Sequence, residues 1–305
     1  MKRNYLIGLI IIILAGGGYA GYEILSDNGI TITTDLLTTT VDTISTNDPT
    51  KSISVCSFNI QFLGHFKKKD NEALADLLKD YDIVVIQELV APPYEGTYPD
   101  GETYSSDDEA QAFFDAMIDQ GFDYILSEED TGPGEDIHTK TSATEWWVAF
   151  YKDEVVDYAT DLPNGFLAED RSQNPNYDRV PYAFPFRADA DTSIDFVLIS
   201  VHLAPGASEM GRREQELDNI ASWIDDNDEN EKDFIILGDM NIEDSIELVA
   251  IIPEGYLSLN DECVRTNTLI NDNPGQGAKP YDHVMYRPEY TSDEIHEVFD
   301  MKVLN

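Results

Sequence analysis

The sequence has little cysteine and little positive charge. Its two cysteines, Cys56 and Cys263, are too few for a disulfide framework, although one bond between them is possible. Cys56 lies in an apolar stretch, where a small buried thiol is expected. The 305 residues include 19 lysines and arginines against 60 aspartates and glutamates, a formal net charge of −41. There is therefore no basic patch that could bind nucleic acid at low ionic strength by releasing counterions from phosphates.

The acidic residues are spread along the whole chain rather than gathered in one tail. This distribution favours a halophilic surface, on which hydrated carboxylates keep the protein soluble in concentrated salt. Attraction to cations or basic partners is the alternative. Hydrophobic residues make up 42% of the chain, which is enough for a substantial core and excludes global disorder.

Long apolar runs are absent except near the N-terminus. Met1-Lys2-Arg3 precedes the apolar run 5–13, and small residues follow. This pattern predicts a signal peptide or an uncleaved transmembrane signal anchor over residues 1–25, because the run is near the lower limit for a bilayer span. Either would export the protein to the cell surface or the medium, and an uncleaved segment would also contact the membrane. Residues 26–52 are predicted to be a polar linker, and residues 53–305 one folded domain.

Short apolar runs of strand length alternate with helical patterns across this domain. The mixture predicts an α/β (α+β) fold in which helices cover packed sheets. The helix 212–226 is expected to bury Leu217, Ile220 and Ile224, with its acids and arginines on the opposite face. The predicted strands are Ile53–Phe58, Ile83–Ile86, Trp146–Tyr151, Phe196–Val201, Phe234–Leu237 and Val284–Tyr286, and the predicted helices are Asn71–Lys79, Asp107–Gln120 and Arg212–Asp226.

Polar residues stand just past the ends of several predicted strands. They include two or three carboxylates, at least two carboxamides and at least one imidazole. Since ligands gather at the carboxyl ends of strands in such sheets, a common site is expected there. A set rich in oxygen ligands favours Mg²⁺, or Mn²⁺ or Ca²⁺, over zinc. The residues are Asn59, Gln87, Glu88, His202, Asp239, Asn241, Asp282 and His283.

Each of these residues also has an ordinary structural explanation. Taken alone, Glu88 would be a solvated charge, Asn59 a turn residue and His202 a structural imidazole. Arg179 would pair with a nearby acid. Trp146 and Trp147 are better explained as core residues than as a substrate platform. The functional interpretation depends on the order in which the motifs occur together.

In that order, the motifs resemble the endonuclease/exonuclease/phosphatase superfamily and its deoxyribonuclease I-like branch. The resemblance covers residue 53 to about residue 287 and implies a four-layer sandwich of two packed mixed β-sheets flanked by helices. The motifs are Ser57-Phe58-Asn59-Ile60-Gln61-Phe62-Leu63-Gly64, Asp82-Ile83-Val84-Val85-Ile86-Gln87-Glu88, Thr144-Glu145-Trp146-Trp147, Asp178-Arg179-Val180-Pro181, Ser200-Val201-His202-Leu203-Ala204-Pro205 and Gly238-Asp239-Met240-Asn241.

The resemblance implies hydrolysis of a phosphodiester by metal-assisted attack of water. Glu88 would be the main metal ligand, with Asn59 beside it. Asp239 would orient or deprotonate the water or contact the metal. The remaining roles are also implied by the resemblance. Asn241 would bind the phosphoryl oxygen or a second ion, and His202 would protonate or stabilise the transferring group. Glu145 would hold the His202 tautomer, Arg179 would clamp a nonbridging oxygen and Asp282 would orient a final histidine.

That final histidine is where the sequence departs from the family pattern. The family ends with a strand that carries Ser-Asp-His. Here Tyr281-Asp282-His283 resembles the strand before it, and Asp293 and His296 are not contiguous. We expect the last strand to lie beyond Asn305. The alternatives are that His283 or His296 substitutes, or that full activity is lacking.

These observations predict an exported or surface-anchored, metal-dependent endonuclease that cleaves DNA in preference to RNA and is a monomer. A lipid or inositol-phosphate phosphoesterase of the same superfamily is one alternative, which the acidic composition favours. A non-catalytic extracellular binding module on this scaffold is the other.

Overall fold

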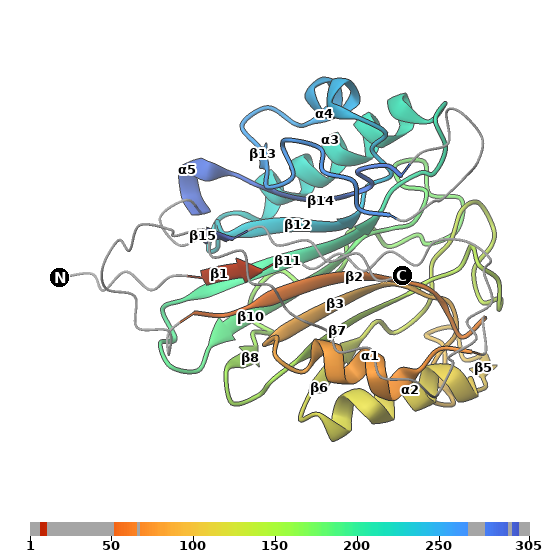
Figure 1. Ribbon diagram of the computed structural model, residues 1–305. Coiled ribbons are helices and arrows are strands. Elements are labelled where there is room, and N and C mark those ends of the chain that lie inside the picture. The colour runs from red at the N-terminus through yellow and green to blue at the C-terminus, as the bar shows by residue number, and fades with distance from the viewer. Residues whose placement is uncertain (1–6, 11–51, 66–67, 268–277, 292–294, 299–305) are drawn as a thin grey trace, which may run out of the picture.

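The computed structural model describes residues 7–10, 52–65, 68–267, 278–291 and 295–298. Two β-sheets pack face to face, and helices cover the outer face of each, so that the layers run helix, sheet, sheet, helix (Figure 1). This arrangement confirms the predicted α/β sandwich. The predicted linker, apart from Ser52, and most of the predicted leader lie outside the described residues.

The first sheet has four strands in the order β2-β3-β7-β6. β2 and β3 are parallel, and β7 runs antiparallel to both of its neighbours. β3 is buried along its whole length because it is covered on both faces, which explains its apolar run Ile83–Ile86. The strands are β2 (Val55–Leu63), β3 (Ile83–Leu89), β6 (Asp123–Leu126) and β7 (Trp146–Tyr151).

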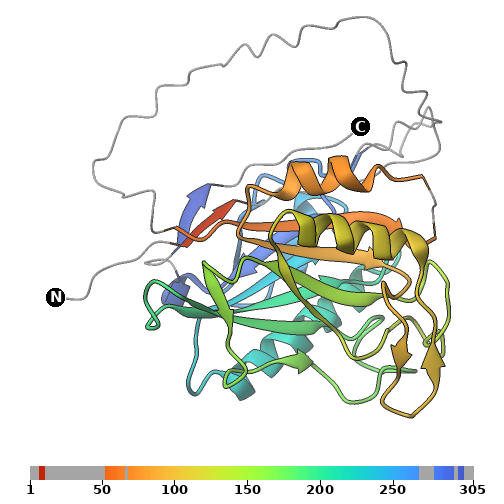
Figure 2. The same ribbon diagram turned by 90° about the horizontal axis from the view of Figure 1, so that it is seen from below.

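Two helices lie side by side over the outer face of this sheet, α1 (Asn71–Leu78) and α2 (Asp108–Asp119) (Figure 2). An aspartate caps each N-terminus. Asp70 accepts a hydrogen bond from the Ala73 N–H, and Asp107 accepts bonds from two backbone N–H groups of the first turn of α2. Between α2 and the sheet, aromatic rings such as Phe113 and Phe150 form an outer core.

The second sheet has seven strands, in the order β13-β14-β12-β11-β10-β8, with β9 paired to β10. β11 and β12 are parallel, whereas β10 and β14 are antiparallel to their neighbours. α3 (Met210–Asn227) and α4 (Ser245–Ile251) cover its outer face (Figure 1). The strands are β8 (Val156–Tyr158), β9 (Gly165–Phe166), β10 (Tyr182–Ala188), β11 (Asp195–His202), β12 (Phe234–Asp239), β13 (Leu257–Ser258) and β14 (Asp282–Tyr286).

Smaller elements lie at the margins. β4 (Gly96–Thr97) and β5 (Thr103–Tyr104) form a hairpin, and α5 (Pro288–Thr291) follows β14. Near the N-terminus, β1 (Ile7–Ile10) pairs in parallel with β15 (Ile295–Val298). Among the described residues, no helix has both the length and the apolarity that a membrane crossing requires.

The main core lies between the two sheets. Trp147 belongs to it, whereas Trp146 points into the outer core under α2, and both rings are buried. The prediction that these tryptophans are core residues is therefore confirmed. Cys56 is buried as predicted, and no disulfide joins it to Cys263 in the described part of the chain.

The prediction that all acids and arginines of α3 face solvent is wrong. Arg213 and Glu216 are fully buried on the apolar face of the helix, together with Leu217 and Ile220. Their burial matters for the site described next, because both side chains hold loops at its edge.

Candidate active site

The ends of four strands bring the predicted site residues to one edge of the sandwich. Because β2 is parallel to β3 and β11 is parallel to β12, the carboxyl ends of these strands meet there. A cavity of about 510 Å³ opens at this edge. Seven of the eight predicted site residues line it, namely Asn59, Glu88, Arg179, His202, Asp239, Asn241 and Asp282. Glu145 lies directly behind this lining and is fully buried.

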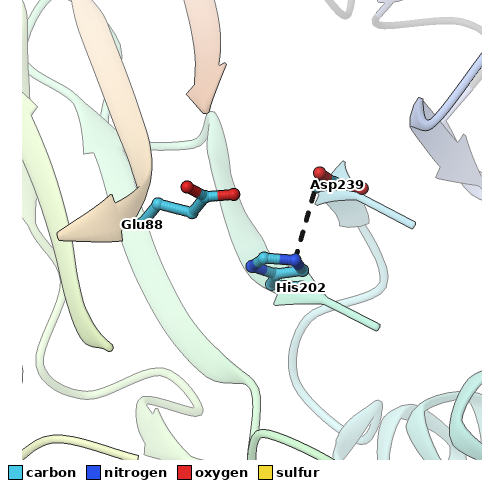
Figure 3. A group of neighbouring side chains, drawn as sticks. All are labelled: Glu88, His202 and Asp239. Atoms are coloured by element: carbon cyan, nitrogen blue, oxygen red, sulfur yellow. Dashed lines mark ion pairs between the residues drawn. The ribbon is translucent and has the colours of Figure 1, made fainter. Parts of the chain in front are cut away.

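Three of these side chains converge from both sheets. Glu88 ends β3, whereas His202 and Asp239 end β11 and β12, and their heads point toward a common space (Figure 3). One ligand atom from each lies within 4.8 Å of the others. His202 Nε2 and Asp239 Oδ2 are 4.0 Å apart.

An irregular backbone positions Glu88. Gln61, Phe62 and Glu88 all adopt positive φ angles of 55–63°, which non-glycine residues seldom do. The bend at the end of β2 places the Phe62 N–H 3.0 Å from Glu88 Oε2. The Glu88 N–H in turn donates to Glu145 Oε2 at 3.1 Å. Strained backbone of this kind concentrates at functional sites, where the surrounding structure must hold it in place.

Asn59 joins the two acids of the site. Its Nδ2 donates to Glu88 Oε1 at 2.8 Å and to Asp239 Oδ2 at 2.9 Å. Its carbonyl oxygen accepts the Gln61 N–H at 3.0 Å. Asn59 thus bonds a carboxylate of each sheet, and a role as direct metal ligand stays a prediction.

Glu145 lies at the centre of a buried charge network. Its Oε1 is 2.6 Å from His202 Nδ1 and 2.9 Å from Arg179 Nε. Arg179 also contacts Asp178 at 3.2 Å. The carboxylate therefore fixes the imidazole with Nε2 facing the cavity and holds the guanidinium beside it.

This network changes the charge state of the site. Burial alone would lower the pKa of His202, but the carboxylate of Glu145, assisted by Asp239, outweighs it and raises that pKa to about 9. Burial would likewise raise the pKa of Glu145, yet His202 and Arg179 hold it below its usual value. The pair is consequently an imidazolium and a carboxylate at neutral pH.

Tight backbone packing positions Asp239 and Asn241. Gly238 has a φ of 137°, and a Cβ there would stand 2.2 Å from the Val201 carbonyl oxygen, so only glycine fits. The Asn241 N–H donates to Asp239 Oδ1 at 3.0 Å, and Asn241 Nδ2 donates to the Leu203 carbonyl at 3.0 Å. Asp239 and Asn241 therefore belong to one turn, which fixes the Asn241 amide beside the Asp239 carboxylate.

Asp282 and His283 follow one another on β14 but have opposite environments. Asp282 lines the cavity, where one of its oxygens accepts from Thr266 Oγ1 at 2.6 Å and the other has no hydrogen-bond partner among the described residues. Burial and the nearby Asp239 raise the pKa of Asp282 well above its usual value. His283 faces away and bonds Ser258, and burial lowers its pKa to about 4. Asp293 lies outside the described residues.

The sequence matches the endonuclease/exonuclease/phosphatase family over residues 56–296. The chain belongs to this family. Members are generally metal-dependent phosphoesterases. A search of curated protein sequences gave no match.

Solved structures show the same fold at low sequence identity. A functionally unknown conserved protein from Enterococcus faecalis V583 aligns with a TM-score of 0.50 and 14% identity, over 76% of this chain and 86% of that one. D. rerio TDP2 complexed with a single-strand DNA product aligns with a TM-score of 0.50 and 15% identity, over 77% and 83%. The human Nocturnin catalytic domain aligns with a TM-score of 0.47 and 14% identity, over 74% and 78%.

The family's metal fits the residues at this edge. Burial, with further contributions from Glu145 and Asp239, raises the pKa of Glu88 to about 7 despite the nearby His202. A carboxylate in that condition is stabilised by an added cation. Glu88 and Asp239 supply oxygen ligands that suit a hard divalent ion such as Mg²⁺.

Sequence reasoning missed two residues that support the site from α3. Glu216 accepts the Asp178 N–H at 2.5 Å and the Ala204 N–H at 2.9 Å, and it thereby joins the loop of Arg179 to the loop after His202. Arg213 bonds the Ala204 and Gly206 carbonyls, each at 2.8 Å. Their spacing was the available signal, because both positions fall in the same helical register as the apolar residues.

Proposed function

We propose that this family member is a metal-dependent phosphodiesterase that hydrolyses nucleic acid, with DNA as the favoured substrate and Mg²⁺ as the ion. The single observation that carries the proposal is the convergence of Glu88, His202 and Asp239 within 4.8 Å at the cavity. Two carboxylates beside a fixed imidazolium can hold a cation against a phosphate, which is what in-line hydrolysis requires.

Each residue has a defined task in this proposal. Asp239 orients the attacking water and accepts its proton. His202, charged through its pair with Glu145, donates a hydrogen bond from Nε2 and protonates the leaving oxygen. Arg179, held on Glu145, clamps a nonbridging oxygen. A bound divalent ion would neutralise the negative charge that develops on the phosphoryl group.

Asn241 and Asp282 complete the proposed site. The fixed amide of Asn241 contacts a phosphoryl oxygen. Asp282 has a buried oxygen without a hydrogen-bond partner among the described residues, so it can accept a hydrogen bond from a donor group that enters the cavity. Such a donor can belong to the substrate or to a histidine from a part of the chain outside the described residues.

DNA is favoured because the TDP2 structure of the same fold is described with a single-strand DNA product. The net charge of −41 opposes a long polyanion, and this favours a lipid or inositol-phosphate ester as the second candidate. Concentrated salt would remove most of that repulsion, since the Debye length falls to about 3 Å at 1 M. We propose further that the protein acts outside the cytoplasm as a monomer, after export through its N-terminal segment.

Nicking of supercoiled plasmid with Mg²⁺ or Mn²⁺ in molar KCl tests the proposal. We expect a chelator to abolish cleavage and His202→Ala and Glu88→Gln each to lower the rate by about 10²–10⁴. Glu154→Gln, an exposed acid in the turn after β7, is the matched control and should leave the rate unchanged. Parallel assays on RNA, sphingomyelin and inositol phosphates decide the substrate class. Activity on lipid or inositol phosphate alone, or on no substrate, would refute the nuclease proposal.

A further inference from the structure

A second group of potential metal ligands lies outside the active site, between the β4–β5 hairpin and the loop that connects β6 to β7. Asp100 and Glu102 stand on the hairpin turn, and His138 stands on the loop. One ligand atom from each residue lies within 4.8 Å of the others. We propose that these three residues, the hairpin site, bind a first-row transition ion of the zinc type. This inference uses no residue of the catalytic cavity and does not depend on the proposed function.

The orientation of the His138 ring is the first argument. Its Nε2 lies 3.3 Å from Glu129 Oε2, and the other oxygen of Glu129 is 3.1 Å from Arg171 Nε. The Glu129 carboxylate, which also contacts this arginine, is placed to accept the Nε2–H. Nδ1 then carries the lone pair, on the side where Asp100 Oδ2 lies 3.7 Å away. A histidine that donates one ring N–H to a carboxylate and presents its other nitrogen is the usual arrangement of a metal ligand.

Packing fixes the ring in this orientation. Tyr98 stacks on the imidazole at a centroid distance of 3.8 Å and an angle of 12°, and Tyr98 itself stacks on the buried Trp146 at 5.8 Å. The His138 N–H donates to Asp130 at 2.8 Å, and this aspartate is 2% exposed and lines the adjoining cavity. The imidazole is thus placed before any ion arrives, which lowers the entropic cost of binding one.

Charge is the second argument. Asp100 and Glu102 come from one turn, and no lysine or arginine in the described parts of the chain forms an ion pair with either. Lys140, on the same loop as His138, contacts Asp107 at 3.1 Å, and Arg171 contacts Glu129. A bound divalent cation would therefore supply the positive charge that these two carboxylates otherwise lack.

The ligand set decides which ion fits. An imidazole nitrogen with two carboxylates suits Zn²⁺, and Mn²⁺ more weakly, whereas Ca²⁺ and Mg²⁺ prefer ligand sets made of oxygen alone. Two of the three ligands are exposed, so water can complete the coordination shell.

Binding at the hairpin site would affect the catalytic cavity through one loop. The segment that carries His138 also lines that cavity with Pro133, Ser142 and Ala143, and it leads into Glu145. An ion that ties this loop to the hairpin would therefore restrain one wall of the cavity from a distance.

Titration with Zn²⁺ alone, followed calorimetrically in 1 M KCl at pH 7.5, tests the inference. The protein is the full chain with Glu88→Gln and Asp239→Asn, which removes the acids of the catalytic site. We expect one Zn²⁺ per chain. His138→Gln should lower the affinity at least tenfold, and so should Asp100→Asn with Glu102→Gln, whose exposed positions leave folding unaffected. Asp136→Asn, an exposed acid on the same loop, is the matched control and should bind as before.

Nitrogen-15 NMR of the His138 ring supplies a readout that an ion pair would not give. Ligation predicts a Zn²⁺-dependent shift confined to Nδ1, with the proton retained on Nε2. The inference is overturned if Zn²⁺ fails to bind with this stoichiometry, if His138→Gln binds as well as the parent, or if both ring nitrogens stay protonated when Zn²⁺ is added. Any of these would mean that His138 only pairs with its acidic neighbours.

Discussion

At the scale of single residues, Glu145 determines the chemistry of the edge without facing the cavity. Both of its oxygens are engaged, one by His202 and Arg179 and the other by the Glu88 N–H. A neutral amide of the same shape would remove the charge and would also place an amide N–H against one of these donors, at some cost in stability. The loss of the charge itself should appear in the pH dependence.

We therefore predict that Glu145→Gln narrows the active pH range from the alkaline side. If protonated His202 is the acid, activity is present below its pKa and is lost as pH rises through about 9. Without the Glu145 charge, burial dominates and lowers the pKa of His202. The loss of activity should therefore begin at a lower pH. The rate against pH, with Glu154→Gln as control, measures this. An alkaline limb that does not move would exclude His202 as the titrating acid.

At the scale of elements, α3 acts as a support for two loops of the site. The two oxygens of Glu216 accept one backbone N–H from the loop of Arg179 and one from the loop after His202. Glutamine offers only one oxygen in the same space and places an amide N–H against the second backbone donor.

Glu216→Gln should accordingly destabilise the fold by about 1–3 kcal/mol, the usual cost of a buried donor left without its acceptor. It should also raise KM more than it lowers kcat, because the substitution displaces Arg179, the proposed phosphate clamp, rather than His202, the proposed acid. Urea unfolding and steady-state kinetics measure the two effects. Asp218→Asn on the exposed side of α3 is the control. If the two variants have the same stability and the same KM, Glu216 does not position the loops.

The turn before β12 contains a pH-sensitive carboxyl group. Burial, together with Asp233 and Asp195, raises the pKa of Glu231 to about 8 although backbone N–H groups of its own turn donate to it. A raised pKa means that the folded state holds a proton that the unfolded state has already lost. The protonated Glu231 therefore makes its full contribution to stability below about pH 4.5. That contribution is lost, and the free energy of unfolding falls, as pH rises toward 8.

Glu231→Gln should remove the part of this dependence that Glu231 contributes, while other buried carboxyls with a raised pKa, such as Glu216, keep theirs. One titrating group can change the free energy of unfolding by at most about 1.4 kcal/mol per pH unit. Urea midpoints for both proteins between pH 5 and pH 8 provide the comparison. A parent protein whose midpoint is constant over that range would show that Glu231 titrates normally.

At the scale of the whole molecule, the uneven charge balance predicts a dependence on salt. With a formal charge of −41, mutual repulsion among surface carboxylates opposes compaction. Raising KCl from 0.1 M to 2 M shortens the Debye length from about 10 Å to less than about 3 Å, so the thermal midpoint should rise. Equal midpoints at both concentrations would argue against a salt-adapted surface.

The sequence was sufficient to predict the layers and the position of the site, because both follow from local patterns. Apolar runs of strand length marked β3, β11 and β12, and the polar residues that follow them marked the edge. β10 was missed because Pro185 in its centre is unusual for an inner strand. Contacts that join distant segments, such as that of Asp100 with His138, leave no periodic signal in one sequence.

The order of the strands along the chain has a consequence for how the site is encoded. Residues up to Tyr151 build the first sheet and contribute Asn59, Glu88 and Glu145, while residues from Val156 onward build the second sheet and contribute Arg179, His202 and the remaining acids. The exposed turn at Asp153 and Glu154 separates the two sets. Each half of the chain thus supplies part of the candidate site, and neither half alone brings Glu88 together with His202 and Asp239.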